Sequence, residues 1–125
     1  MGRTSSAKVL PIRTVRRRLI EARLLSAERA LGSATAVAEW LGVDRSRITR
    51  WKGGELPDPA LEEQLVALDA VVSLLRGYLD EEVIVDWLLG INANLGDRRP
   101  LDVLRDGRLS EVVAAVEAEK SGAFA

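Results

Sequence analysis

Apolar residues recur at intervals of three and four along most of this 125-residue chain, which is the spacing of amphipathic helices. The pattern predicts helices over residues 15–31, 34–41, 45–51, 59–79, 80–89, 100–107 and 111–120. Three acids, Asp80 to Glu82, open the fifth of these helices, where the positive end of the helix dipole favours them. No segments pair as strands would, so the predicted fold class is all-α.

Capping residues and helix breakers mark the boundaries between these helices. Four residues with short polar side chains stand at the expected N-cap positions: Ser33, Asp44, Asp58 and Ser110. Pro59 follows Asp58 at the first helical position, where its missing N–H costs nothing. The glycine pair at 53–54 ends the third helix. The chain is therefore divided into short helices around one long helix.

The long helix predicted over residues 59–79 has a broad apolar face. Its apolar positions are Leu61, Leu65, Val66, Leu68, Val71, Val72, Leu74, Leu75 and Leu79. Such a face needs cover on more than one side. The sequence leaves two interpretations open: a helix inside the core, or a helix partly covered by a second subunit.

Residues 34–51 have the spacing of two short helices that meet at a steep angle, as in a helix-turn-helix motif. The residues expected to form their shared core are Val37, Ala38, Leu41, Val43, Ile48 and Trp51. Trp40 and Trp51 have apolar neighbours at helical spacing, so we expect both rings in the core and not as platforms for stacked bases.

The free face of the third helix is polar and basic. Its candidate DNA-binding residues are Arg45, Ser46, Arg47, Thr49, Arg50 and Lys52. Arginine can donate two hydrogen bonds to guanine in the major groove, and serine or threonine can reach bases or phosphates. The alternative is a set of ordinary solvated charges. Two interpretations are likewise open for the cluster Arg16, Arg17 and Arg18: the arginines contact DNA phosphates, or they form a solubilising face.

The net charge of −1 hides a strong asymmetry between the two halves of the chain. Residues 1–23 hold seven bases and one acid, a net charge of +6, and residues 24–54 add +2. Residues 55–125 hold six bases and fifteen acids, a net charge of −9. A basic half attracts the phosphate backbone and an acidic half is repelled by it, so we expect two different partners.

The composition excludes several kinds of chemistry. The chain has no cysteine and no histidine, which removes thiolate ligands, the commonest metal ligand and the commonest general base. No nucleophile and base are arranged recognisably, so we expect no enzyme, no metal and no cofactor. No apolar run approaches the roughly 20 residues that span a bilayer, and we expect a cytoplasmic protein without a membrane role.

From Trp87 onward the sequence resembles a known family. The matching residues are Trp87, Asn92, Leu95, Gly96, Arg99, Pro100, Leu101, Leu104, Gly107 and the ending Gly122-Ala123-Phe124. They resemble the toxin-binding domain of Xre/MbcA/ParS-like antitoxins, and especially the MbcA-type members, in which a helix-turn-helix half precedes this domain. Ile91 departs from the family, which often has proline there.

The resemblance implies a type II toxin-antitoxin system whose partner is a RES-domain toxin that destroys NAD. The antitoxin would carry no chemistry of its own. It would occupy the toxin surface and obstruct the mouth of the NAD pocket. It would also repress its own operon by binding operator DNA as a homodimer.

The candidate toxin-binding residues are Arg98, Arg99, Arg105, Gly122, Ala123 and Phe124. The resemblance implies that the segment around Gly122 and Phe124 plugs the toxin. Phe124 is the one phenylalanine of the chain, and an aromatic anchor on a chain end suits a partner's pocket. The alternative is that Phe124 folds back onto its own last helix. The arginines suit the rim of an interface, although each also suits a solvated surface.

The expected organisation is a flexible basic arm at 1–12, a helix-turn-helix DNA-binding module at 13–56, and a helical dimerisation and toxin-binding domain at 57–125. Two other functions remain open from the sequence. One is a stand-alone helix-turn-helix transcriptional repressor whose acidic half only dimerises. The other is a structural adaptor that no longer binds DNA.

Overall fold

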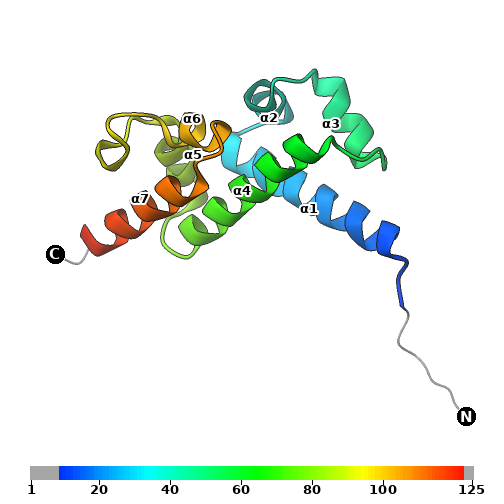
Figure 1. Ribbon diagram of the computed structural model, residues 1–125, viewed down its shortest axis with the longest axis horizontal. Helices are drawn as coiled ribbons and strands as arrows, with labels where there is room; N and C mark the ends of the chain where they lie inside the picture. Colours follow the sequence, from blue (N-terminus) through cyan, green and yellow to red (C-terminus); the bar gives the residue numbers. More distant parts are fainter. Residues whose placement is uncertain (1–8, 123–125) are drawn as a thin grey trace, which may run out of the picture.

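The computed structural model describes residues 9–122, and Figure 1 shows them as a bundle of helices. The helices are α1 (Ile12–Leu31), α2 (Ala34–Leu41), α3 (Arg45–Lys52), α4 (Pro59–Arg76), α5 (Glu81–Leu89), the 3-10 helix η1 (Ala93–Leu95), α6 (Pro100–Arg105) and α7 (Leu109–Gly122). Extended pairing within this range is limited to one bridge between Asn92 and Arg98. The predicted all-α class is confirmed.

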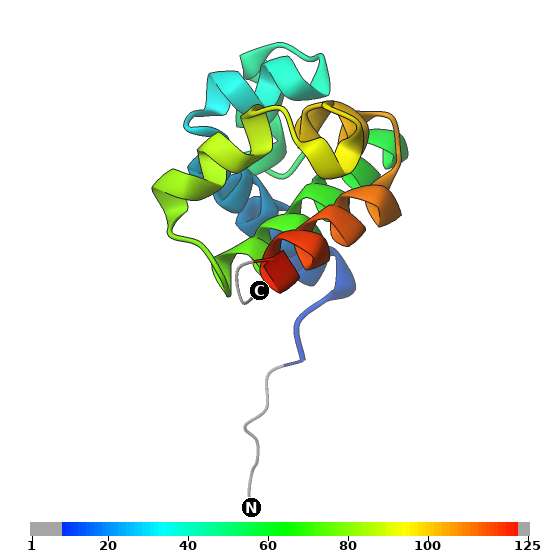
Figure 2. The same cartoon turned by 90° about the vertical axis from the view of Figure 1, so that its left-hand side faces the viewer.

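The long helices α1 and α4 pack against each other and organise the bundle. The α2–α3 pair packs on α1, whereas α6 and α7 pack on α4. Figure 2 shows α7 beside α4 in a view turned by 90°. As a result α3 and the C-terminal end of α7 lie toward opposite ends of the long axis (Figure 1).

One continuous apolar core joins both halves of the chain. Ile20 and Leu24 of α1 lie in it together with Leu68 of α4, and each is at most 1% exposed. Val116 of α7 belongs to the same cluster. Full burial of such a side chain stabilises the fold by about 1.5–3 kcal/mol. The N-terminal helices are therefore packed onto the rest of the chain and not joined to it by a linker.

The broad apolar face of α4 is covered mainly from within the chain, by α1, α5, α6 and α7. Leu65, Leu68 and Leu75 are fully buried, whereas Val66 remains 40% exposed. Most of this face therefore lies inside the core of the chain and is not covered by a second subunit. In α7 the apolar spacing predicts burial of Val112, Val113 and Val116. Val113 is only half-buried, and Ala115 lies in the core instead.

Several helix boundaries differ from the prediction, most of all at the start of α1 and the end of α4. α1 begins at Ile12 instead of residue 15, directly after the extended backbone of Pro11. Ile12 is 85% exposed in the first turn, so no buried apolar residue marks the start of this helix. α4 ends at Arg76 instead of residue 79 because Gly77 interrupts it. α7 begins at Leu109, before the expected residue 111, once Gly107 has turned the chain at a φ of +80°.

The predicted caps are only partly confirmed. The Ser33 hydroxyl accepts a hydrogen bond from the Ala36 N–H at 3.0 Å, as expected of an N-cap. Asp44 and Asp58 occupy N-cap positions, but neither side chain accepts a capping hydrogen bond. Asp58 instead pairs with an arginine of α3. Ser110 is not an N-cap, because it lies within the first turn of α7.

Candidate functional site

The helices α2 and α3 are joined by the tight turn Gly42 to Asp44. Gly42 has a φ of +72°, and its N–H donates to the last carbonyls of α2, which allows the chain to reverse within three residues. Val37, Leu41, Ile48 and Trp51 are buried beneath the turn, as expected, whereas Val43 is only half-buried. Trp40 and Trp51 are both in the core, so neither ring offers a stacking surface.

The outward face of α3 carries four of the six candidate DNA-binding residues. Arg45, Ser46, Thr49 and Arg50 are exposed and lie opposite the buried Ile48 and Trp51. Arg50 has its guanidinium 3.4 Å from the carboxylate of Glu55, and both side chains remain about half-exposed. This face therefore presents two cations and two hydroxyls to the solvent.

Arg47 and Lys52 lie on the flanks of α3 and contact the rest of the fold. The Arg47 guanidinium stands 5.8 Å from the centre of the Trp51 ring and 3.4 Å from the Asp58 carboxylate. Lys52 pairs with Glu28 of α1. The six candidate residues are thus divided between an outward face and two flanks, and the flanking cations are partly neutralised.

The three consecutive arginines of α1 point in different directions. Arg16 donates to Glu62 of α4 at 2.6 Å, and this hydrogen bond, with the charge of Glu62, raises the pKa of the Arg16 guanidinium. Arg17 lies against the turn that follows α3, close to Gly54. Arg18 is exposed. Arg16 therefore connects α1 to α4, and the three side chains do not form one surface.

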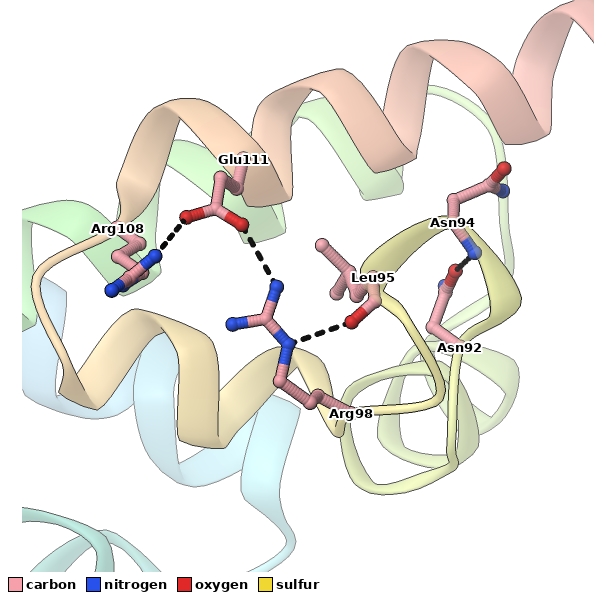
Figure 3. A network of polar contacts seen from close by, with 6 residues as sticks. All are labelled: Asn92, Asn94, Leu95, Arg98, Arg108 and Glu111. Atoms are coloured by element: carbon pink, nitrogen blue, oxygen red, sulfur yellow. Dashed lines mark hydrogen bonds and ion pairs between the residues drawn. The ribbon is translucent and has the colours of Figure 1, made fainter.

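Arg98, a candidate toxin-binding residue, holds the loop after α5 against α7, as Figure 3 shows. Its guanidinium donates to the Leu95 carbonyl at 2.7 Å and to the Glu111 carboxylate at 2.8 Å. Arg108 donates to the other oxygen of Glu111 at 3.0 Å. The hydrogen bonds from Arg98 and Arg108 lower the pKa of the Glu111 carboxylate. Arg98 is half-exposed and has a structural role in addition to any contact with a partner.

The loop itself turns sharply at Gly96 and Asp97, which both have positive φ angles. The Asn92 side chain accepts from the Asn94 N–H at 2.9 Å and shapes the start of this turn (Figure 3). Aspartate tolerates the left-handed conformation better than most residues do. The residues that carry the family resemblance at this point therefore determine the backbone of the loop.

Arg99 and Arg105 line one cleft of about 360 Å³ between α2 and α6. Arg105 donates from its Nε to the Trp40 carbonyl at 3.2 Å, whereas Arg99 is exposed at the start of α6. Leu89 lines the same cleft and is 47% exposed, and Ile91 nearby in sequence is 73% exposed. Neither side chain could be identified from the sequence as an exposed apolar contact, because their exposure depends on how α5 packs.

The candidate toxin-binding residues are not gathered in one place. Arg98 contacts the first turn of α7, at Glu111, whereas Gly122 ends that helix. Eleven residues of helix separate these points, or about 17 Å at 1.5 Å per residue. Gly122 is exposed, and Ala123 and Phe124 lie outside the described residues. Residues 1–8 of the expected arm at 1–12 also lie outside the described residues.

Two further expectations concern metals and membranes. Within residues 9–122, no three histidine, cysteine, aspartate or glutamate side chains gather as a metal site would require. In the same range, none of the helices combines the length and the apolar character needed to cross a bilayer.

Comparisons with known proteins relate the chain to one group of antitoxins. It is 31% identical over 78 residues to the mycobacterial cidal antitoxin MbcA of Mycobacterium tuberculosis, and equally to that of Mycobacterium bovis. The match covers 62% of this chain and 69% of each relative. No family model matches the sequence.

The fold agrees with this relationship. A chain in the crystal structure of the M. tuberculosis MbcT-MbcA toxin-antitoxin complex superimposes with a TM-score of 0.70 at 25% sequence identity. The superposition covers 86% of this chain and 98% of the other. The protein is therefore an all-α member of an antitoxin family. It belongs to the family of the mycobacterial cidal antitoxin MbcA.

Proposed function

We propose that this protein is the antitoxin of a type II toxin-antitoxin pair, with a RES-domain toxin that degrades NAD as its partner. The observation that carries the proposal is the match in fold to a chain of the MbcT-MbcA toxin-antitoxin complex over 98% of that chain. The 31% identity to MbcA supports the same function. In this proposal the protein binds its partners and catalyses nothing.

We propose that the N-terminal half binds operator DNA and thereby represses the operon of the pair. The outward face of α3 supports this role, because Arg45, Thr49 and Arg50 are exposed on one short helix of a size that enters the major groove. Proteins of this kind commonly bind as dimers to two half-sites, and a homodimer is part of the proposal. The function then divides between residues 13–56 and 57–125, although one core joins them.

The toxin would bind the C-terminal half and lose access to its NAD pocket. Two surfaces support this role. One is the cleft with Arg99 and Arg105, where the exposed Leu89 adds an apolar contact inside a charged rim. The other is the tail after Gly122, whose Phe124 offers an aromatic anchor. Truncation after Gly122 and substitution of Arg99 test the two surfaces separately.

The experiment is co-expression with the RES-type protein encoded beside this gene, with growth and cellular NAD as readouts. We compare the full chain with a chain that ends at Gly122, which leaves α7 whole. The proposal expects the full chain to restore both growth and NAD. Rescue that is lost in the shortened chain assigns neutralisation to the tail, and equal rescue assigns it to the cleft with Arg99.

Failure of the full chain to restore growth, at normal expression, contradicts the antitoxin proposal. The stand-alone repressor then becomes the better interpretation if the purified protein still binds the DNA upstream of its gene. The structural adaptor becomes the better interpretation if it does not. NAD consumption by the purified chain alone would contradict the expectation that the protein is not an enzyme.

A further inference from the structure

The first turns of α1 extend beyond the core and carry two arginines on the side that faces α3. Arg13 and Arg17 are spaced by four residues and continue the row of Ile20 and Leu24, both of which are buried beneath the neighbouring helices. Residues at such spacing share one face of a helix. The two guanidiniums therefore occupy the side of α1 on which α3 packs.

The turn that follows α3 passes directly against Arg17. A Cβ built on Gly54 would lie 3.3 Å from the Nε and 3.4 Å from the Cζ of Arg17. Gly54 also has a φ of +114°, which other residues rarely adopt. A glycine at this position therefore allows the guanidinium to lie beside the C-terminal end of α3.

A cleft of about 280 Å³ opens at this point. Its lining residues are Arg13, Thr14, Arg17, Gly53, Gly54 and Leu56. The lining contains two guanidiniums and one hydroxyl, and it contains no carboxylate. Arg16 differs from its neighbours because Glu62 neutralises it on another side of the helix.

The cleft adjoins the C-terminal end of α3, through Gly53 and Gly54. Arg50 lies on the outward face of α3, and its carbonyl accepts from the Glu55 N–H at 3.0 Å in the turn that contains Gly53 and Gly54. The turn that ends α3 therefore joins the exposed Arg50, which pairs with Glu55, to the glycine that lies against Arg17. A helix in a major groove has the phosphates of both strands on either side of it. Cations beside the end of such a helix meet phosphates and not base edges.

We infer that Arg13 and Arg17, with the hydroxyl of Thr14, form a site for a DNA backbone phosphate at the edge of the groove that α3 enters. This inference rests on the proposed DNA binding. A guanidinium binds phosphate with a planar fork of donors, and the contact carries no sequence information. The pair therefore adds affinity and orientation, whereas sequence preference comes from Arg45, Thr49 and Arg50.

The test measures binding to two duplexes of about 30 base pairs, one from the DNA upstream of this gene and one of mixed sequence, over a series of salt concentrations. We expect Arg17→Ala to weaken binding to both duplexes by the same factor. The slope of log K against log salt should fall in magnitude by about 1 for each phosphate contact removed. Arg13→Ala should behave similarly, and Arg17→Lys should retain most of the slope.

Arg29→Ala is the matched control, because Arg29 is an exposed arginine on the same helix. It lies twelve residues beyond Arg17, about 18 Å along the helix axis. We expect this variant to bind both duplexes as the unchanged protein does. Thermal unfolding of each variant confirms that it is folded before binding is compared.

An unchanged salt slope in both Arg17→Ala and Arg13→Ala, while Arg45→Ala loses affinity, overturns the inference and leaves the proposed DNA binding intact. A protein that binds neither duplex contradicts the proposed DNA binding itself. The inference is also overturned if both variants bind DNA normally but lose binding to phosphatidylserine vesicles, because the arginines then serve a membrane surface.

Discussion

Arg105 donates a hydrogen bond from its Nε to the main-chain carbonyl of Trp40 at 3.2 Å. The Trp40 indole in turn donates to the Leu101 carbonyl at 2.9 Å. These two bonds connect α6 to α2, so the helices of the proposed toxin-binding half hold the first helix of the α2–α3 pair directly. A toxin that contacts Arg99 and Arg105 would therefore act one helix away from the proposed DNA-binding face.

Arg45→Ala and Arg50→Ala should each lower the affinity for DNA from the upstream region of this gene by about 1–3 kcal/mol if they contact bases. The loss should be smaller on a mixed-sequence duplex, because base contacts carry the specificity. Fluorescence anisotropy on both duplexes measures the difference. Equal losses on the two duplexes would show that these arginines contact phosphates only.

Arg47→Ala should mainly affect stability. The change removes a cation from above the Trp51 ring and an ion pair with Asp58, which together contribute on the order of 1 kcal/mol at a half-exposed position. Urea unfolding measures this loss, and DNA affinity should change less than in Arg45→Ala. A large loss of DNA affinity with no loss of stability would instead place Arg47 in the groove.

Trp40→Phe should destabilise the fold by about 1–3 kcal/mol, since it removes a buried hydrogen bond to Leu101 and leaves a small cavity. Trp87→Phe is the matched control. The Trp87 indole donates to the Glu119 carboxylate at 3.1 Å in a half-buried position, so its loss should cost less. Equal losses in the two variants would show that the connection between α2 and α6 adds no special stability.

The pH dependence of stability should include a contribution from Glu111. Arg98 and Arg108 lower the pKa of Glu111 in the folded state, so its contribution is present above the unfolded-state pKa and is lost as the pH falls through the folded-state pKa. Glu111→Gln should therefore flatten the fall in unfolding free energy on acidification below about pH 5. If the unfolding free energy of Glu111→Gln falls on acidification as steeply as that of the unchanged protein, solvent screens the contacts of Glu111 with Arg98 and Arg108.

Arg99→Glu should weaken toxin binding with little effect on folding. Arg99 is exposed and lines the cleft that Leu89 also lines, so a reversed charge acts on the partner and not on the core. Calorimetry with the RES-type protein encoded beside this gene measures the affinity. Arg18→Glu provides the charge-matched control, because Arg18 is exposed and lies thirteen residues before Leu31, the residue of α1 that lines the cleft. Unchanged affinity in Arg99→Glu would exclude this cleft and favour the tail.

The helices could largely be predicted from the sequence because their signals are local. Ser33 begins α2 and Pro59 opens α4, as expected. Each of these signals acts through the backbone of the neighbouring turn and needs no distant partner. The boundaries at Ile12 and Leu109 differed from the prediction. Ile12 is 85% exposed, so no buried residue marks that start, and Leu109 packs against the core once Gly107 has turned the chain.

The pairing of the charges depended on the tertiary structure alone. Arg16 meets Glu62 across 46 positions, and Lys52 meets Glu28 on another helix. Helical spacing shows which side chains share a face, but the crossing of two helices decides which faces meet. That crossing neutralised Arg16 and brought Arg17 to Gly54. The sequence by itself therefore determined an all-α chain with a basic helix near its N-terminus. The packing of α1 on α3 and α4 decided which of its cations face a partner.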